Sequence, residues 1–358
     1  MNFRKIAPPL ASLVLALPLA ATAAGNFRDV LDIPARESAF AAKSLLNGVA
    51  NAGKRTVAVG QRGHIVFSDD GGKTWTQAKV PVSSDLVAVY FPIPAKGWAV
   101  GHDGVVLHTA DGGATWIRQL DGRGAGQLMA NYYVARAEQG ALGSGETAAA
   151  LVDEAKRIGA QGAENAFLDV WFADENNGFI VGAFNLIFRT GDGGKTWEPW
   201  FHRTENPNRL HLYAVRKASG GIYIVGEQGT VLKLDPAGTK FVALDAGYKG
   251  SFFGIAGAGD AVTIFGLRGN AFRSTDGGKS WQKTATNLPD GITGAASCGG
   301  SRLLMVSQSG KVLLSDDAGA SFRPVKIEHP SPATAVACLG EGAAVIAGTR
   351  GVRVQAIQ

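Results

Sequence analysis

The residues with the clearest potential for chemistry are carboxylates that recur in one type of loop. Residues 68–75 read S-D-D-G-G-K-T-W, and the spacing S-x-D-x-G-x-T-W returns along the chain. Facing carboxylates form the acid–base pair of glycosidases, whereas an Asp inside a tight loop accepts hydrogen bonds from the loop's own amides. Because the Asp recurs in one fixed frame, the spacing predicts the structural role. The residues concerned are Asp70, Asp111, Asp192, Asp276 and Asp317.

Two copies of this loop, the Asp box, depart from the pattern. Residues 315–322 keep Asp317 but have Phe322 in place of the Trp. Residues 234–241 read L-D-P-A-G-T-K-F, with Pro236 where the Asp belongs. We therefore expect the frame of this second loop to survive without the hydrogen bonds of an Asp.

The other reactive side chains show no metal or cofactor signature. The six histidines are scattered singly, and the two cysteines lack the spacing of a metal site. Cys298 and Cys338 stand in small, apolar surroundings, which favours buried free thiols. A disulfide is the alternative that an oxidising compartment permits. The sequence predicts no metal, no cofactor and no catalytic residue.

The elements that position these loops repeat with a period of about 41 residues, typical of the four-stranded blades of a β-propeller. An apolar strand ending in a tight turn precedes each loop. One interval, between Gly101 and Gly182, is nearly doubled, and residues 121–165 within it read as two helices, about 127–138 and 146–158. We predict an all-β, seven-bladed propeller with one helical insertion between blades 2 and 3. The turn marks are Gly60, Gly101, Gly182, Gly226, Gly266, Ser307 and Gly348.

The two ends of the chain carry separate predictions. Residues 1–24 combine Arg4 and Lys5 with a short apolar run and small residues, which indicates a signal peptide; a membrane anchor is the alternative. We expect residues 25–358 to form the propeller in the periplasm. The last repeat supplies three strands, so we expect residues 27–33 to add the fourth and close the ring.

The turns between the second and third strands keep their glycines and vary in between, which is where a scaffold usually carries binding residues. Arg62, Arg268 and Arg350 fall on one arc of the ring, and the opposite arc carries acidic residues. Such an arc is suited to an acidic partner, because Arg engages carboxylates in pairs. The insertion is expected to rise from the same face. The candidate partner-binding residues are Arg62, Arg268, Arg350, His102, Asp103, Phe184, Glu227 and Gln228.

A signal peptide followed by V-G-x-x-G-x-I/V-x-x-S/T-x-D-G-G-x-T-W units resembles the photosystem II stability and assembly factor family of Asp-box propellers. The resemblance covers nearly all of residues 25–358. It implies a non-enzymatic role in assembling a membrane protein complex, through contact by an arginine-rich surface to which Arg62, Arg268 and Arg350 correspond. A monomer at most peripheral to the membrane is expected.

The alternative function is a sialidase-like glycoside hydrolase or a carbohydrate-binding propeller, because sugar hydrolases share the Asp box. The F-R-I-P motif of sialidases is missing, and residues 33–36 read I-P-A-R instead. Nucleic acid is not an expected partner, because the formal net charge of +5 is modest and no aromatic residues interleave the basic ones.

Overall fold

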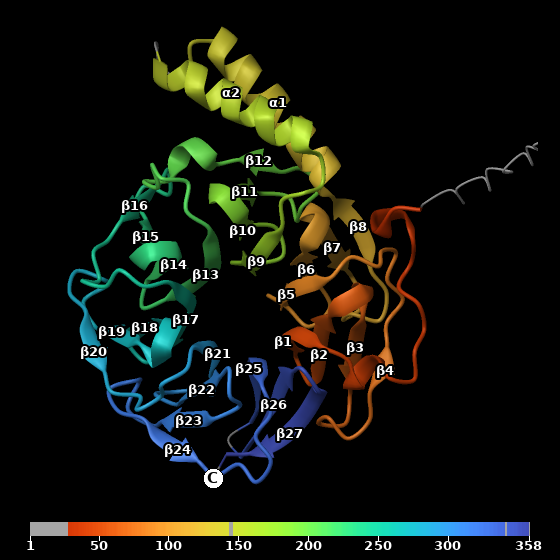
Figure 1. Cartoon of the computed structure of the whole chain (residues 1–358), viewed down its shortest axis with the longest axis vertical. Coiled ribbons are helices and arrows are strands. Elements are labelled where there is room, and N and C mark those ends of the chain that lie inside the picture. Colours follow the sequence, from red (N-terminus) through yellow and green to blue (C-terminus); the bar gives the residue numbers. More distant parts are fainter. Residues whose placement is uncertain (1–27, 143–145, 341, 358) are drawn as a thin grey trace, which may run out of the picture.

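The computed structural model describes residues 28–142, 146–340 and 342–357, and it confirms the seven-bladed propeller (Figure 1). Seven antiparallel sheets surround a central channel, and each runs outward from its first strand. The first three blades are β1 (Leu46–Ala52), β2 (Arg55–Gly60), β3 (Ile65–Ser68) and β4 (Thr76–Gln77); β5 (Leu86–Tyr90), β6 (Gly97–Gly101), β7 (Val106–Thr109) and β8 (Ile117–Leu120); and β9 (Phe167–Phe172), β10 (Gly178–Gly182), β11 (Ile187–Thr190) and β12 (Glu198–Pro199).

The remaining four blades follow the same plan up to the last, in which three strands are described. They are β13 (Leu212–Ala218), β14 (Gly221–Gly226), β15 (Val231–Leu234) and β16 (Phe241–Ala243); β17 (Phe252–Ala258), β18 (Ala261–Gly266), β19 (Ala271–Ser274) and β20 (Gln282–Thr284); β21 (Ile292–Ser297), β22 (Leu303–Ser307), β23 (Val312–Ser315) and β24 (Arg323–Val325); and β25 (Ala333–Leu339), β26 (Ala343–Gly348) and β27 (Gly351–Ala356).

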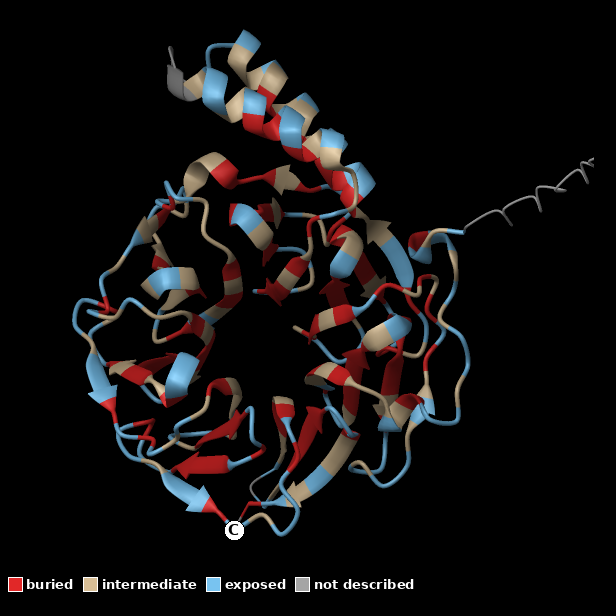
Figure 2. Cartoon of the chain, in the orientation of Figure 1, coloured by how far each residue is buried: buried red, intermediate tan, exposed pale blue. Residues whose placement is uncertain are grey.

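The core lies between neighbouring blades rather than in one central cluster (Figure 2). Strands β6, β10, β18 and β22 are buried at every position, because both of their faces pack on adjacent sheets. Between blades 2 and 3, the indole of Trp98 stacks on the ring of Phe172 with 3.6 Å between ring centroids. Each blade therefore needs its neighbours in order to bury its apolar faces.

The Asp boxes are closed by hydrogen bonds within each loop. The Asp70 carboxylate accepts from the amides of Lys73 and Thr74 and from the Thr74 hydroxyl, while the Ser68 hydroxyl accepts from the Gly72 amide. The same set recurs at Asp111, and a slightly smaller one at Asp192, Asp276 and Asp317. Hydrogen bonds from Thr74 hold the pKa of Asp70 below its ordinary value, and those from Ser321 lower the pKa of Asp317 to about 2.

The prediction that the loop at residues 234–241 lacks these bonds is wrong. Asp235 accepts from the amide of Thr239 at 2.7 Å and from its hydroxyl at 2.6 Å. The frame is shifted by one residue, so that Asp235 and Thr239 take the places expected for Pro236 and Lys240. The carboxylate thus lies one residue before the position that the repeat spacing from Gly238 assigns to it.

The predicted closing strand at the N-terminus is also wrong. Phe27 lies outside the described residues, and the segment after it forms the 3-10 turn η1 (Val30–Asp32) beside blades 1 and 2. Leu31 is buried among the side chains of those blades, and Asp32 pairs with Arg118 and Arg123. The ring closes instead by packing β1 against β25, with the Thr334 hydroxyl donating to the Leu46 carbonyl.

The two cysteines form a disulfide, so the expectation of free thiols is wrong. Cys338 lies in β25 and Cys298 follows β21 directly, at equivalent positions of adjacent blades. Their Cα atoms are 5.4 Å apart, a separation that a disulfide spans without backbone movement. The bridge joins blade 6 to blade 7.

The insertion forms the helical hairpin that the sequence predicts, with α1 (Gly122–Glu138) and α2 (Glu146–Gln161). The helices approach closely where Gly126 faces Gly159, because a Cβ at Gly126 would lie 2.9 Å from the Gly159 Cα. The hairpin extends outward from the rim beside β12 (Figure 1). The hairpin therefore begins on the expected side, where the turns between second and third strands lie, but it does not cover that side.

Side chains fasten this hairpin to blade 3. The Tyr132 hydroxyl donates to Glu198 at 2.9 Å, and Glu154 pairs with Arg209 at 2.7 Å. The Tyr133 hydroxyl lies 2.9 Å from Nδ1 of His202. The backbone amide of His202 also donates to the Tyr133 hydroxyl, at 3.2 Å. These contacts hold the helical hairpin against blade 3.

The first prediction tests the Asp-box hydrogen bonds. Thr109 Oγ1 accepts from the buried Gly113 amide at 2.9 Å. Thr109→Val keeps the side-chain shape but leaves that amide without an acceptor, which should lower the unfolding free energy by about 1–3 kcal/mol in urea titrations. Thr349→Val, in an exposed turn, is the control and should change little. Equal stability of the two variants would contradict this role.

The second prediction concerns pH. Burial, together with Arg203 and Arg136, lowers the pKa of His202 from its ordinary value of 6.5 to about 4. Between these pH values His202 is protonated in the unfolded chain but remains neutral in the native chain. The free energy of unfolding should therefore fall as the pH drops from 6.5 toward 4. His202→Asn keeps a hydrogen-bonding side chain near Tyr133 but does not titrate, so it should make this decline shallower in thermal unfolding. Exposed His329→Asn should leave the decline unchanged; the same effect in both variants would refute the assignment.

Candidate partner-binding face

In six of the seven blades, a close backbone contact fixes the turn between the second and third strands; blade 6 has Ser307 at this position. The amide of His102 donates to the Asp85 carbonyl, and a Cβ on the preceding Gly101 would lie 2.1 Å from that oxygen. No side chain fits there, which explains why glycine recurs at this mark. Gly60, Gly182, Gly226, Gly266 and Gly348 show the same approach.

In five of these turns, a residue other than glycine has a left-handed backbone conformation, with positive φ. They are the 3-10 turns η3 (Gln61–Gly63), η4 (His102–Gly104), η5 (Ala183–Asn185), η7 (Glu227–Gly229) and η8 (Leu267–Gly269). Their central residues, with φ of 51–58°, are Arg62, Asp103, Phe184, Gln228 and Arg268. This conformation costs about 1 kcal/mol or more for a residue with a Cβ. Five of the predicted site residues therefore occupy one structural position.

The arginine arc, defined as Arg62, Arg268 and Arg350, is exposed. In the described part of the chain none of the three guanidinium groups forms an ion pair. Their backbone is nevertheless fixed: the Arg62 amide donates to the Asp85 carboxylate at 2.7 Å. The arc therefore presents unpaired positive charge on blades 1, 5 and 7.

The opposite arc combines acid with aromatic surface. The ring of Phe184, 49 % exposed, lies edge-on to the ring of His211 with 4.5 Å between centroids. Glu227 accepts from the His211 amide at 2.9 Å, whereas Gln228 and His102 are exposed and Asp103 is half-buried. The structure thus distributes the predicted residues over every blade except the sixth and does not gather them into one cluster.

An aromatic row, which sequence reasoning missed, leads from Phe184 into the channel. His211 is followed by Tyr213 at 6.2 Å and then by Phe253 of blade 5 at 5.9 Å, measured between ring centroids. Tyr213 and Phe253 stand at the first strands of their blades, where their alternation with buried residues reads as ordinary strand patterning. Their convergence depends on the closed ring and is invisible in any one repeat.

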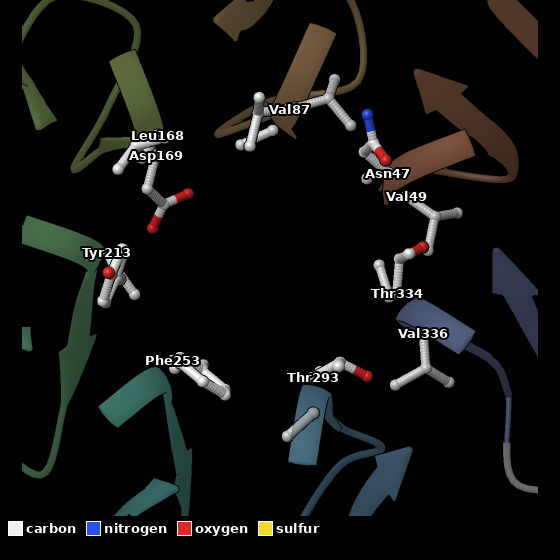
Figure 3. Close-up of a pocket in the computed structure, with 18 of the residues that line it drawn as sticks. Asn47, Val49, Val87, Leu168, Asp169, Tyr213, Phe253, Thr293, Thr334 and Val336 are labelled. Atoms are coloured by element: carbon white, nitrogen blue, oxygen red, sulfur yellow. The ribbon is translucent and has the colours of Figure 1, made fainter. Parts of the chain in front are cut away.

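The channel holds a cavity of about 460 Å³ (Figure 3). Its wall contains Asp169, 3 % exposed, which accepts from Arg216 Nη1 and from the Val215 amide. Burial raises the pKa of Asp169, and the Arg216 charge opposes that shift. The sequence signal for Asp169 was its position as the one charged residue in the otherwise apolar β9. Polar neighbours are Asn47, Thr293 and Thr334.

The described residues contain no group of three or more His, Cys, Asp or Glu side chains arranged to hold a metal ion. Within the same residues, neither helix is long and apolar enough to span a bilayer.

Solved structures with the same fold cover nearly the whole chain. One, described as YCF48 bound to D1 peptide, is 16% identical with a TM-score of 0.62, covering 88% of this chain and 94% of that one. YCF48 from Cyanidioschyzon merolae gives 16% and 0.62, covering 90% and 98%. Virginiamycin B lyase from Staphylococcus aureus, 11% identical, gives 0.64, covering 88% and 96%. Such likeness shows the fold alone.

The sequence is also similar to curated relatives and to a family model. The photosystem II assembly lipoprotein Ycf48 of Synechococcus sp. (strain CC9902) is 25% identical over 128 residues, which are 35% of this chain and 38% of that relative. The match thus spans little more than a third of the relative. The model of the photosynthesis system II assembly factor YCF48 matches residues 41–133 and 153–286, more than half of the chain. This chain therefore belongs to the YCF48 family of photosystem II assembly factors.

Proposed function

We propose that this protein is a non-catalytic assembly or accessory factor that binds an acidic polypeptide of a membrane protein complex outside the cytoplasm. It acts as a monomer through the turn face, defined as the side carrying the turns between second and third strands. The arginine arc is the observation that carries the proposal: three exposed guanidinium groups, unpaired within the described residues, stand on equivalent turns. Family membership supports an assembly role, and one family structure was described with a bound peptide.

The contrast between the two faces supports this choice. The Asp-box face is built from loops whose polar groups are engaged in their own hydrogen bonds. On the turn face, the side chains change from blade to blade, while in five blades the turn backbone has the same conformation. Such a surface is suited to recognition, because the scaffold holds exposed groups in place and leaves their chemistry free to vary.

The hydrolase alternative finds less support in the channel. A glycosidase of the usual type needs two carboxyl groups about 5–10 Å apart on either side of the substrate. Asp169 is the one carboxylate among the described channel-lining residues, and Arg216 engages it. Glu227 is half-buried and bonded to the His211 amide. These contacts favour binding over hydrolysis.

The third prediction tests the turn face. Changing Arg62, Arg268 and Arg350 together to Glu should abolish capture of the partner from a membrane extract, because the arc then repels acidic groups. The unfolding midpoint should stay nearly constant, since exposed charges contribute little to stability. Capture by the native protein should also weaken as salt is raised, because exposed charges are screened.

The matched control changes Lys73, Lys195 and Lys279, on the Asp-box face, to Glu. This variant carries the same change in charge and should retain capture. If only this control lost capture, the partner would bind the Asp-box face and the turn-face proposal would be wrong. Turnover of a chromogenic glycoside that disappears with Asp169→Asn would instead favour the hydrolase.

A further inference from the structure

The outer edge of blade 7 differs from that of every other blade. Blades 1 to 6 each have a fourth strand, whereas β27 ends the sheet among the described residues. In those residues, no backbone hydrogen bond from another strand reaches the outer edge of β27. An unpaired edge offers a row of amide and carbonyl groups to which an extended chain can add.

An arginine stands on this edge strand where the other blades bury an apolar residue. Arg353 pairs with Ile346, two residues before the turn glycine. The residues in the same register of the other blades are Val66, Leu107, Phe188, Leu232, Phe272 and Leu313, all buried. Blade 7 alone in this register carries a charge.

The Arg353 guanidinium is incompletely satisfied. Its Nη1 donates to the Ser331 hydroxyl, but its Nε and Nη2 are buried without a hydrogen-bond partner in the described part of the chain. Burial lowers its pKa, consistent with a charge that lacks a counter-ion. A buried donor without an acceptor is costly, so a carboxylate delivered here would gain both hydrogen bonds and charge pairing.

The fourth strands of the other blades show which position could bring a carboxylate to Arg353. On a fourth strand, one residue lies directly across from the register position that Arg353 occupies. In blades 1 to 6 these opposing residues are Gln77, Arg118, Pro199, Ala243, Lys283 and Pro324. Cross-strand neighbours lie on the same face with Cβ atoms about 5 Å apart, within reach of an ion pair.

We propose that an extended, acidic segment of a partner polypeptide adds to β27 as the fourth strand of blade 7, with an Asp or Glu opposite Arg353. The segment's backbone pairs with the free edge, and its carboxylate accepts from the Arg353 guanidinium. This inference rests on the proposed function only in that the partner is a polypeptide. The binding surface is a different one: the sheet edge, not the turn face.

Two other occupants fit less well. Residues 1–27 contain no Asp or Glu, and the described chain after them pairs through Asp32 with Arg118 and Arg123 of blade 2 and its insertion. Residues 36 and 38 then bond Gln77 on the outside of blade 1. A second copy pairing through β27 would bring another Arg353 to the same edge, and like charges across strands are destabilising.

The experiment uses the full chain and labelled nine-residue peptides of alternating Thr and Val with Glu at the centre. Matched peptides carry Lys at the centre, or N-methyl groups on alternate amides. Fluorescence anisotropy should show the Glu peptide binding at least about tenfold more tightly than the Lys peptide, because one charge-assisted hydrogen bond is worth about that factor. The N-methylated peptide should not bind. Hydrogen exchange should slow at residues 351–356.

Arg353→Leu restores the apolar residue of the other blades, so it should fold at least as stably and lose the preference for Glu over Lys. Arg323→Leu, on the paired strand β24, is the control and should keep that preference. Absence of peptide binding, equal affinity for the Glu and Lys peptides, or protection away from β27 would each overturn the proposal. If Arg353→Leu failed to fold, the three peptides on the native chain would still decide.

The same binding assay separates this inference from the turn-face proposal. The double variant Arg62→Glu/Arg268→Glu leaves β27 intact, so it should lose partner capture while keeping peptide binding. Arg353→Leu should show the opposite pattern, with a larger effect on peptide binding than on partner capture. Loss of peptide binding in the double variant would show that the peptide occupies the turn face, which refutes strand addition but not the proposed function.

Discussion

In six of the seven blades, the glycine that ends the second strand lies against the carbonyl before the first strand, and the geometry of the turns between second and third strands depends on this contact. Six glycines approach such an oxygen so closely that a Cβ would lie 2.1–2.3 Å away. In five of these six blades the next residues form a 3-10 turn whose middle residue has positive φ, whereas blade 7 makes the same contact at Gly348 without such a turn. The contact therefore fixes the path of the backbone from which the variable side chains of these turns project.

Features carried by a repeat could be predicted from the sequence, and features that arise between repeats could not. The turn glycines and Asp boxes recur in register, so blade number and the insertion followed from spacing. The disulfide was missed because the 5.4 Å between Cys298 and Cys338 depends on how two blades pack. Asp235 was missed because its loop is shifted by one residue.

The candidate site divides in the same way. Arg62 and Phe184 were found because variable residues between fixed glycines stand out in an alignment of repeats. Asp169 and Tyr213 were not: Tyr213 reads as ordinary strand patterning, Asp169 stands out only as a single charge in β9, and only the closed ring turns both toward a shared channel. The prediction of a closing strand was wrong for a related reason: the missing fourth strand of the last repeat suggested one, but nothing in the repeat indicates that Leu31 is buried beside blades 1 and 2.

The left-handed residues also affect how this surface should be mapped. In most proteins, removing a side chain by alanine leaves the backbone preference nearly unchanged, whereas glycine loosens the chain. At Arg62, Asp103, Phe184, Gln228 and Arg268 the order is reversed, because the backbone already occupies the conformation that glycine prefers. A glycine scan, not an alanine scan, would erase each contact here while relieving strain, so that a loss of affinity reports the missing side chain alone.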